Sequence, residues 1–191
     1  MANKDYSITK TPPNIQRRPQ NARDDDWIRS FLETTEIGHI ATRWDDQPFL
    51  TPTTFWYDEA HERIIFHSNI VGRVRANIER HPKVCLEASR YGKFLPSNTA
   101  LEFTVQYASV IVFGTASILE DPEDRRQALY GLIGKYFPGM VPGVEYHPIT
   151  DKELERTTVY AIDIESWSGK ENWPEQAKQS NDWPPLVTSQ D

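Results

Sequence analysis

Six short runs rich in β-branched and aromatic residues constrain the fold of this 191-residue chain more than any other feature of its sequence. Such residues are favoured in strands, and the polar breaks at 44–47 and 58–62 have the length of hairpin turns. The first three strands are therefore expected to form an antiparallel meander. The six runs cover residues 37–43, 48–57, 63–68, 83–90, 103–117 and 157–167.

Helical patterns are few. Three acids at 24–26 precede apolar residues at helical spacing, and Asp121-Pro122 begins a second helix that is expected to end near Pro138. Thr150 and Glu153 form a capping box for one further turn. The chain is thus mainly β with a few helices, and closing its sheet into an antiparallel barrel removes exposed edges. Because Pro52 cannot donate a ladder hydrogen bond, the barrel is expected to be split at the second strand.

The chain has the length of one ordinary domain, flanked by two polar segments. Residues 1–23 carry five basic side chains and one acid, a charge of +4, which leaves −11 for the rest of a chain whose total is −7. This basic N-terminal arm is either a flexible, solvated leader or a segment that packs on a partner subunit. Residues 171–191 are expected to form a C-terminal arm or to be disordered, so the folded domain spans 24–170.

Charge and cysteine content narrow the class of protein. An acidic balance disfavours nucleic acid and anionic membranes as partners, because both are bound by cationic surfaces. No apolar run approaches the roughly 20 residues that span a bilayer, and residues 1–23 lack a secretory apolar core. The single cysteine, Cys85, excludes an internal disulfide and suits a reducing compartment. We therefore expect a cytoplasmic protein.

Several standard chemistries lack their motifs. The sequence contains no GxGxxG, GxxxxGK, HExxH, GxSxG or CxxC pattern, which excludes the usual dinucleotide, P-loop, zinc-protease, hydrolase and dithiol sites. His39 and His67 lie in expected strands, but nothing in their spacing favours a metal site. No metal is expected.

The most informative segment runs from Phe66 to Arg80. A strand ends in Ser68 and Asn69, a loop passes through a glycine, and a short helix begins at Arg73. Backbone N–H groups at a helix start, the helix dipole and a guanidinium together hold a phosphate. Spacing alone also fits a loop and helix with a solvated basic face.

This segment, followed by His81-Pro82-Lys83-Val84, resembles the strand, loop and helix of the FMN-binding split barrels related to pyridoxamine 5′-phosphate oxidase. Residues 38–42, 47–49, 112–116 and 167–170 are similar to matching strands of that family, most of all in its nitroimidazole-resistance branch. The resemblance covers about residues 24–170 and implies a six-stranded antiparallel split β-barrel that binds FMN. Because a small filled barrel has little pocket of its own, we expect a homodimer with flavin sites at the interface.

The resemblance also implies roles for individual residues. In one subunit His67 and Ser68 line the ribityl chain and the phosphate, and Arg73 grips the phosphate. The backbone from Pro52 through Thr53 and Thr54 to Phe55 runs beside the flavin ring. Ser109 and Trp167 reach the flavin from the second subunit.

Some positions depart from the family pattern. The family has Arg and Lys on its second strand, where this chain has Thr51 and Trp56, and its Lys after the phosphate-binding Arg is Val74 here. Arg75 and Lys170 are candidates to replace that charge. The C-terminal Arg-rich segment that holds pyridoxal phosphate in true pyridoxamine phosphate oxidases has no counterpart in 171–191, so that activity is not expected.

Two functions follow. The favoured one is an FMN-dependent oxidoreductase that reduces small electron-poor molecules such as nitroaromatics. The cofactor then carries the chemistry, and His67 is the candidate donor of a proton or a hydrogen bond. The alternative is a module that binds flavin, haem or the deazaflavin F420 for storage, sensing or degradation.

Overall fold

The computed structural model describes residues 10–186. Residues 1–9 of the expected basic arm and 187–191 of the expected C-terminal arm lie outside this range. The strands are β1 (Ala22–Arg23), β2 (Ile37–Trp44), β3 (Gln47–Thr54), β4 (Trp56–Asp58), β5 (Arg63–Asn69), β6 (Lys83–Leu95), β7 (Thr104–Ile118) and β8 (Thr157–Asn172). The helices are α1 (Asp25–Thr34), α2 (Arg73–Arg80), α3 (Pro122–Tyr136) and α4 (Asp151–Leu154), with 3-10 turns at η1 (Pro19–Asn21), η2 (Glu59–His61) and η3 (Ala100–Glu102).

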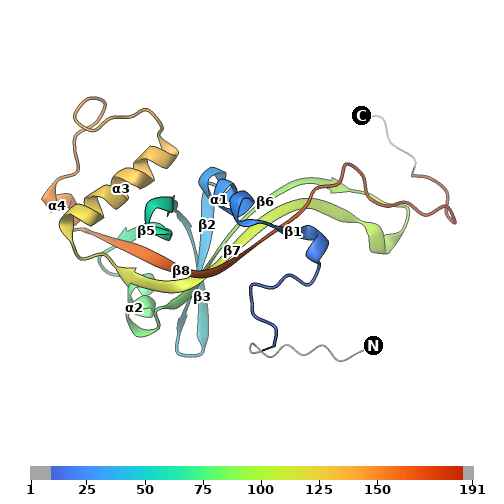
Figure 1. Ribbon diagram of the computed structural model, residues 1–191, viewed down its shortest axis with the longest axis horizontal. Helices are drawn as coiled ribbons and strands as arrows, with labels where there is room; N and C mark the ends of the chain where they lie inside the picture. Colours follow the sequence, from blue (N-terminus) through green and yellow to red (C-terminus); the bar gives the residue numbers. More distant parts are fainter. Residues whose placement is uncertain (1–9, 187–191) are drawn as a thin grey trace.

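The strands of the described chain form one antiparallel sheet in the order β3-β2-β6-β7-β8-β5-β4, and β1 adds beside β8 (Figure 1). The expected strand 48–57 is divided at Phe55: its first part, β3, pairs with β2, and its second part, β4, pairs with β5. The two ends of the sheet order are therefore consecutive in the chain and are joined by this one residue. The prediction of a mainly β chain folded as an antiparallel split barrel is confirmed.

The larger of two hydrophobic cores fills the inside of the curled sheet. Alternate side chains of β2, β5, β6, β7 and β8 point into it, and α1 packs against it through Ile28, Phe31 and Leu32, which are at most 2% exposed. The acids at 24–26 act as predicted, because the Asp24 side chain accepts a hydrogen bond from the Trp27 backbone N–H at 2.9 Å. Burying each large apolar side chain contributes about 1.5–3 kcal/mol, so this face of α1 fixes its place.

The smaller core lies on the outer face of the sheet, beneath α3. Ala128 and Leu132 of the helix pack there with Ile65, Val159 and Ala161 of the strands. Asp121 caps the helix start as predicted, accepting a hydrogen bond from the Asp124 N–H at 2.8 Å. The helix ends at Tyr136, slightly before the predicted end, because Pro138 disfavours the helical conformation in the residue before it. The capping box of Thr150 and Glu153 is also present.

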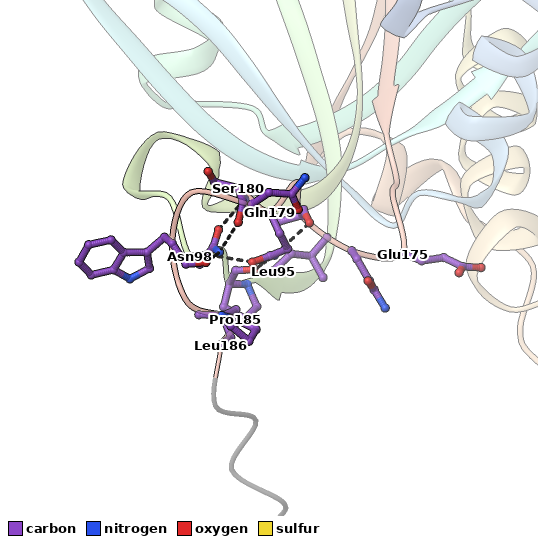
Figure 2. Close-up of a pocket in the computed structure, with 12 residues that line it drawn as sticks. Leu95, Asn98, Glu175, Gln179, Ser180, Pro185 and Leu186 are labelled. Atoms are coloured by element: carbon purple, nitrogen blue, oxygen red, sulfur yellow. Dashed lines mark hydrogen bonds between the residues drawn. The ribbon is translucent and has the colours of Figure 1, made fainter.

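Beyond the barrel, β6 and β7 continue as a projecting two-stranded arm, residues 91–105, and the tail 173–186 returns along it (Figure 1). Asn98 at the tip of the arm holds the tail. Its Nδ2 donates to the Ser180 carbonyl at 2.8 Å, and its Oδ1 accepts from the Ser180 N–H at 2.7 Å (Figure 2). A pocket of about 600 Å3 lies between arm and tail, with Leu95, Pro185 and Leu186 in its wall.

The described part of the basic segment packs on its own chain. Gln16 donates from Nε2 to the Ser168 hydroxyl at 3.0 Å, and Asn21 donates from Nδ2 to the Tyr107 hydroxyl at 3.1 Å. β1 then pairs with β8, with Ala22 opposite Lys170. This segment therefore covers the outer face of β7 and β8.

Candidate functional site

The candidate site is the split between the free edges of β3 and β5. Trp56 of β4 pairs with Ile65 of β5, and the same register continued by two residues would place Thr54 opposite His67. That pairing is absent, because β3 and β4 stand at opposite ends of the sheet order. Pro52 lies on this free edge, where its missing N–H leaves no donor unpaired. Backbone groups on these two edges therefore have no partner strand in the described chain.

Tyr136 fixes the residue at which the split begins. Its hydroxyl accepts a hydrogen bond from the Phe55 N–H at 2.9 Å and lies 2.9 Å from the Phe55 carbonyl and 2.5 Å from the Glu36 carbonyl. Phe55, itself fully buried, is thereby held on the β2 side. Since backbone groups of successive strand residues point to opposite sides, those of Thr54 face the split. Thr53, the residue before Thr54, donates from its hydroxyl to the Thr54 carbonyl at 3.1 Å.

Arg73 is the first residue of α2, after the loop that follows β5. Its guanidinium carbon lies 5.2 Å from the ring centroid of Trp44 and 5.3 Å from that of Phe49. Within residues 10–186 it has no carboxylate partner, whereas Arg80 pairs with Asp45 at 2.7 Å. The charge of Arg73 is therefore oriented by aromatic rings and left without a counter-ion.

The start of α2 is also open. Gly72, with φ near 150°, is the N-cap residue and has no side chain to accept from the first-turn N–H groups. Uncapped N–H groups at the positive end of the helix dipole favour an anion. The arrangement of loop, helix start and free guanidinium expected from the sequence is present in the fold.

His67 and Ser68 are adjacent in β5 but lie on opposite faces of the sheet. Ser68 points inward, with its hydroxyl 3.0 Å from the Tyr160 hydroxyl. His67 points outward on the face of Ile65, beneath α3, and lines a pocket of about 430 Å3. Desolvation beneath α3 lowers the pKa of His67 below its usual value of 6.5, which favours the neutral imidazole. The two side chains cannot meet a ligand from the same side.

Arg75, a candidate to replace the missing charge, is engaged elsewhere. Its Nε pairs with Glu79 at 2.7 Å, and its Nη1 donates to the Ile70 carbonyl at 2.9 Å. Arg75 therefore braces the loop between β5 and α2. Lys170 lies on β8 opposite Ser109, with its Nζ 5.5 Å from the ring centroid of Tyr107.

Trp167 lies apart from Ser109 and Lys170. Its Nε1 donates to Asp25 Oδ1 at 2.8 Å, and its ring meets Tyr57 edge-on at 5.9 Å. Both partners belong to the same chain. Trp167 thus packs against α1 on the inner face of the sheet, whereas Ser109 and Lys170 lie on the outer face.

Sequence reasoning missed four side chains of this region. Tyr136 and Lys135 at the end of α3 contact Phe55, and Trp44 and Phe49 of the first hairpin stack on Arg73. The aromatic residues that flank the turn at 45–46 were the available signal for the second pair. Nothing in the sequence indicates the first pair, because α3 reaches Phe55 only through the tertiary fold.

Two further observations concern the described residues as a set. In residues 10–186, no three or more His, Cys, Asp or Glu side chains gather where they could hold a metal ion. None of the helices in this range has the length and apolar character needed to cross a bilayer.

Comparison with known proteins identifies the family. The model of the family described as pyridoxamine 5′-phosphate oxidase matches residues 24–171, and the chain belongs to this family. The match spans both edges of the split and the loop before α2. No curated protein matches the chain.

Solved structures share the fold. The flavocytochrome Anf3 from Azotobacter vinelandii is 24% identical, with a TM-score of 0.75 over 88% of this chain and 76% of that one. The FAD and haem binding protein from Mycobacterium smegmatis is 22% identical, with a TM-score of 0.70 over 81% and 75%. A candidate 5-nitroimidazole antibiotic resistance protein from Bacteroides thetaiotaomicron is 19% identical, with a TM-score of 0.66 over 78% and 84%. At these identities the likeness establishes the fold.

Proposed function

We propose that this chain binds a flavin nucleotide, FMN in the first instance, in the split between β3 and β5, and works as an oxidoreductase on small electron-poor molecules such as nitroaromatics. The observation that carries the proposal is Arg73 at the uncapped start of α2, a guanidinium oriented by Trp44 and Phe49 that has no carboxylate partner among residues 10–186. Membership of the pyridoxamine 5′-phosphate oxidase family and the flavin proteins among the similar structures support it.

The residues of the split suit the parts of a flavin nucleotide. Arg73 and the first N–H groups of α2 would hold the phosphate, and the open edge of β3 from Pro52 to Thr54 would hydrogen-bond the ring. When bound, the flavin supplies electron transfer, while the protein orients it and excludes water. Lys170, on the outer face beside the N-terminal segment, would meet the flavin of a second subunit in a homodimer, whereas Ser109 is buried within its own chain.

Binding of FMN and riboflavin by the Arg73→Ala variant tests the proposal. Loss of a charge-assisted contact costs about 1.5–3 kcal/mol, so FMN affinity should fall roughly 10- to 150-fold. Riboflavin, which lacks the phosphate, should lose little. Arg80→Ala, which removes a guanidinium that is paired with Asp45 and also lies over the Trp44 ring, is the matched control. Equal losses of both ligands, or no loss of either, in fluorescence titrations would contradict the proposal.

A second candidate is a module that carries haem, alone or beside a flavin. Two of the similar structures are a flavocytochrome and a protein that binds FAD and haem, and this chain offers a neutral imidazole, that of His67, in a pocket with apolar walls. The absorption spectrum of the purified protein separates the two candidates. Flavin bands without a Soret band support the first, and a Soret band supports the second.

A further inference from the structure

A pocket of about 430 Å3 lies outside the split, between α3 and the outer face of β5. Leu129, Leu132 and Ile133 of α3 form one wall, and Ile149 closes another side. His67 and Thr157 line it from β5 and β8. The volume is that of a site for a small molecule, and mostly apolar walls with a few polar groups are typical of such sites.

The polar groups of this pocket with unused hydrogen-bonding capacity in the described chain are the Tyr146 hydroxyl and the ring of His67. The His67 ring has no hydrogen-bond partner in the described chain, whereas His147, also in the wall, donates from Nδ1 to the Pro148 carbonyl at 2.8 Å. A neutral imidazole carries one donor and one acceptor, and both are available at His67. The same residue forms the edge of the split, so a ligand in the pocket would lie next to whatever the split holds.

The charges around the pocket disfavour an anion. No lysine or arginine lines it, and the Glu153 carboxylate does. Hydrogen bonds from the Thr150 N–H and hydroxyl, both 2.8 Å, lower the pKa of Glu153 and keep it ionised. The nearest guanidinium groups of α3 are occupied: Arg125 donates to the Thr157 carbonyl at 2.8 Å and Arg126 pairs with Asp151 at 2.7 Å. Among the described residues that line the pocket, a phosphate would meet a carboxylate and neither lysine nor arginine.

We propose that this pocket binds an uncharged aromatic molecule of one or two rings, whose polar group hydrogen-bonds to His67, and that it rejects phosphorylated molecules. The ligand would accept electrons from the flavin, and this role is the one part of the inference that rests on the proposed function. The pocket itself belongs to the chain without any cofactor. Its walls select for neutral compounds, in contrast to the anion site at Arg73.

Histidine ring signals in NMR spectra of the labelled full chain test the proposal, with para-nitrobenzyl alcohol and para-nitrobenzyl phosphate as matched probes. The alcohol should shift the signals of His67 and His147 and leave those of His39 and His61 unchanged. The phosphate should shift none of the signals of pocket residues. The measurement is made on flavin-free and on FMN-loaded protein, so that the pocket is tested separately from flavin binding.

Two substitutions on one loop provide the matched variants. Ile149→Asp places a charge in the wall and should weaken binding of the alcohol about tenfold or more. Val144→Asp changes a side chain that is 75% exposed and outside the wall, and should change affinity less than twofold. Thermal melts establish that both variants are folded. If Ile149→Asp is unfolded, His67→Leu takes its place.

The results separate the two proposals. Equal binding of alcohol and phosphate, or no shift at His67 with either, would overturn the inference even if FMN binds. Shifts at His67 in a protein that never binds FMN would uphold the pocket and contradict the proposed function alone. Hemin that binds with a Soret band, lost in His67→Leu, would assign the pocket to haem and also overturn the inference.

Discussion

At the scale of single residues, Lys135 is the most unusual group in the described chain. Its Nζ lies 3.6 Å from the ring centroid of Phe55 and donates to the carbonyl of Leu32, near the end of α1, at 2.9 Å. Burial lowers the pKa of this amine to about 8, against an ordinary value of 10.5, although the charge of Glu33 opposes the shift. Lys135 thus ties α1 and α3 to the residue at which the split begins.

The lowered pKa of Lys135 predicts how stability changes in mild alkali. Between about pH 8 and 10.5 the unfolded chain binds a proton at this amine that the folded chain has lost. The contribution of this group to the free energy of unfolding therefore rises as the pH increases across that window, and it falls again as the pH is lowered toward 8. Lys135→Met removes the effect, so the free energy of unfolding of wild type relative to the variant should increase from pH 8 to pH 10. Urea titrations at several pH values measure it, and a constant difference would contradict the prediction.

A second prediction at this scale concerns the catalytic role expected of His67. If the imidazole donates a proton or a hydrogen bond during turnover, His67→Gln should lower kcat by roughly 10² while FMN stays bound. Because burial lowers the pKa of His67, any step that needs its protonated form should be fastest in acid. The rate should fall as the pH rises, with a midpoint below the usual imidazole range. A fully active variant with a flat pH–rate profile would leave His67 as a wall of the pocket.

At the scale of elements, an irregularity in β8 explains why the face of the sheet on which Trp167 lies could not be predicted from the alternation of side chains along the strand. The register of β8 against β7 shifts between Phe113 and Gly114, where Ser166 and Ile164 are the partners and Glu165 is the extra residue. A bulge of one residue moves every later side chain to the other face. Trp167 thus turns inward to α1, and Lys170 turns outward. An unbulged strand would have placed them the other way round.

The arm and tail yield a prediction for Asn98. Its Nδ2 is within 3.3 Å of three tail carbonyls, those of Ser180, Trp183 and Pro184, and its Oδ1 accepts from Ser180. Asn98→Ala removes these contacts together, so the tail after Gln179 should exchange its amide hydrogens faster and be cleaved earlier by protease. Asn181→Ala, in the same tail, is the control. Hydrogen exchange that is unchanged in Asn98→Ala would show that apolar contacts alone hold the tail.

At the scale of the whole molecule, no segment within residues 10–186 covers the outer face of β3 and β2 as α3 and the N-terminal segment cover other strands. Leu50 is 64% and Ile37 44% exposed. A cross-strand pair joins His39 Nδ1 to Glu87 Oε2 at 3.1 Å on the same face. An exposed apolar patch around a partly buried polar pair is typical of a surface that meets another protein.

We therefore expect this face to join two copies of the chain about a two-fold axis. Light scattering at micromolar concentration should give twice the 22.1 kDa mass of one chain. Leu50→Asp should shift the mass toward the monomer, and Val144→Asp should not. A wild-type mass of one chain with flavin bound would contradict the prediction.

The sequence was sufficient for the parts that depend on local rules. Strand propensity located the sheet, and the caps at Asp24, Asp121 and Thr150 located three helices, because each depends on a few neighbouring residues. The open helix start at Arg73 was also predictable, from one loop and one turn. The inward turn of Trp167 and the contacts of Lys135 were not, because a bulge and the seating of α3 are decided by tertiary packing.

The connection of β3 to β4 through the single residue Phe55 also affects how the barrel is assembled during folding. The strands at the two rims, β3 and β4, are neighbours in the chain, so joining them adds almost no loss of chain entropy. The distant contacts are elsewhere: Gly38 pairs with Ala88, and Arg63 pairs with Asp163, a hundred residues further along. Local hairpins can form early, and the pairing of β5 with β8 completes the barrel. Since His67 lies on β5 and Thr157 on β8, the pocket they line should be absent from any partly folded form in which these two strands have not paired.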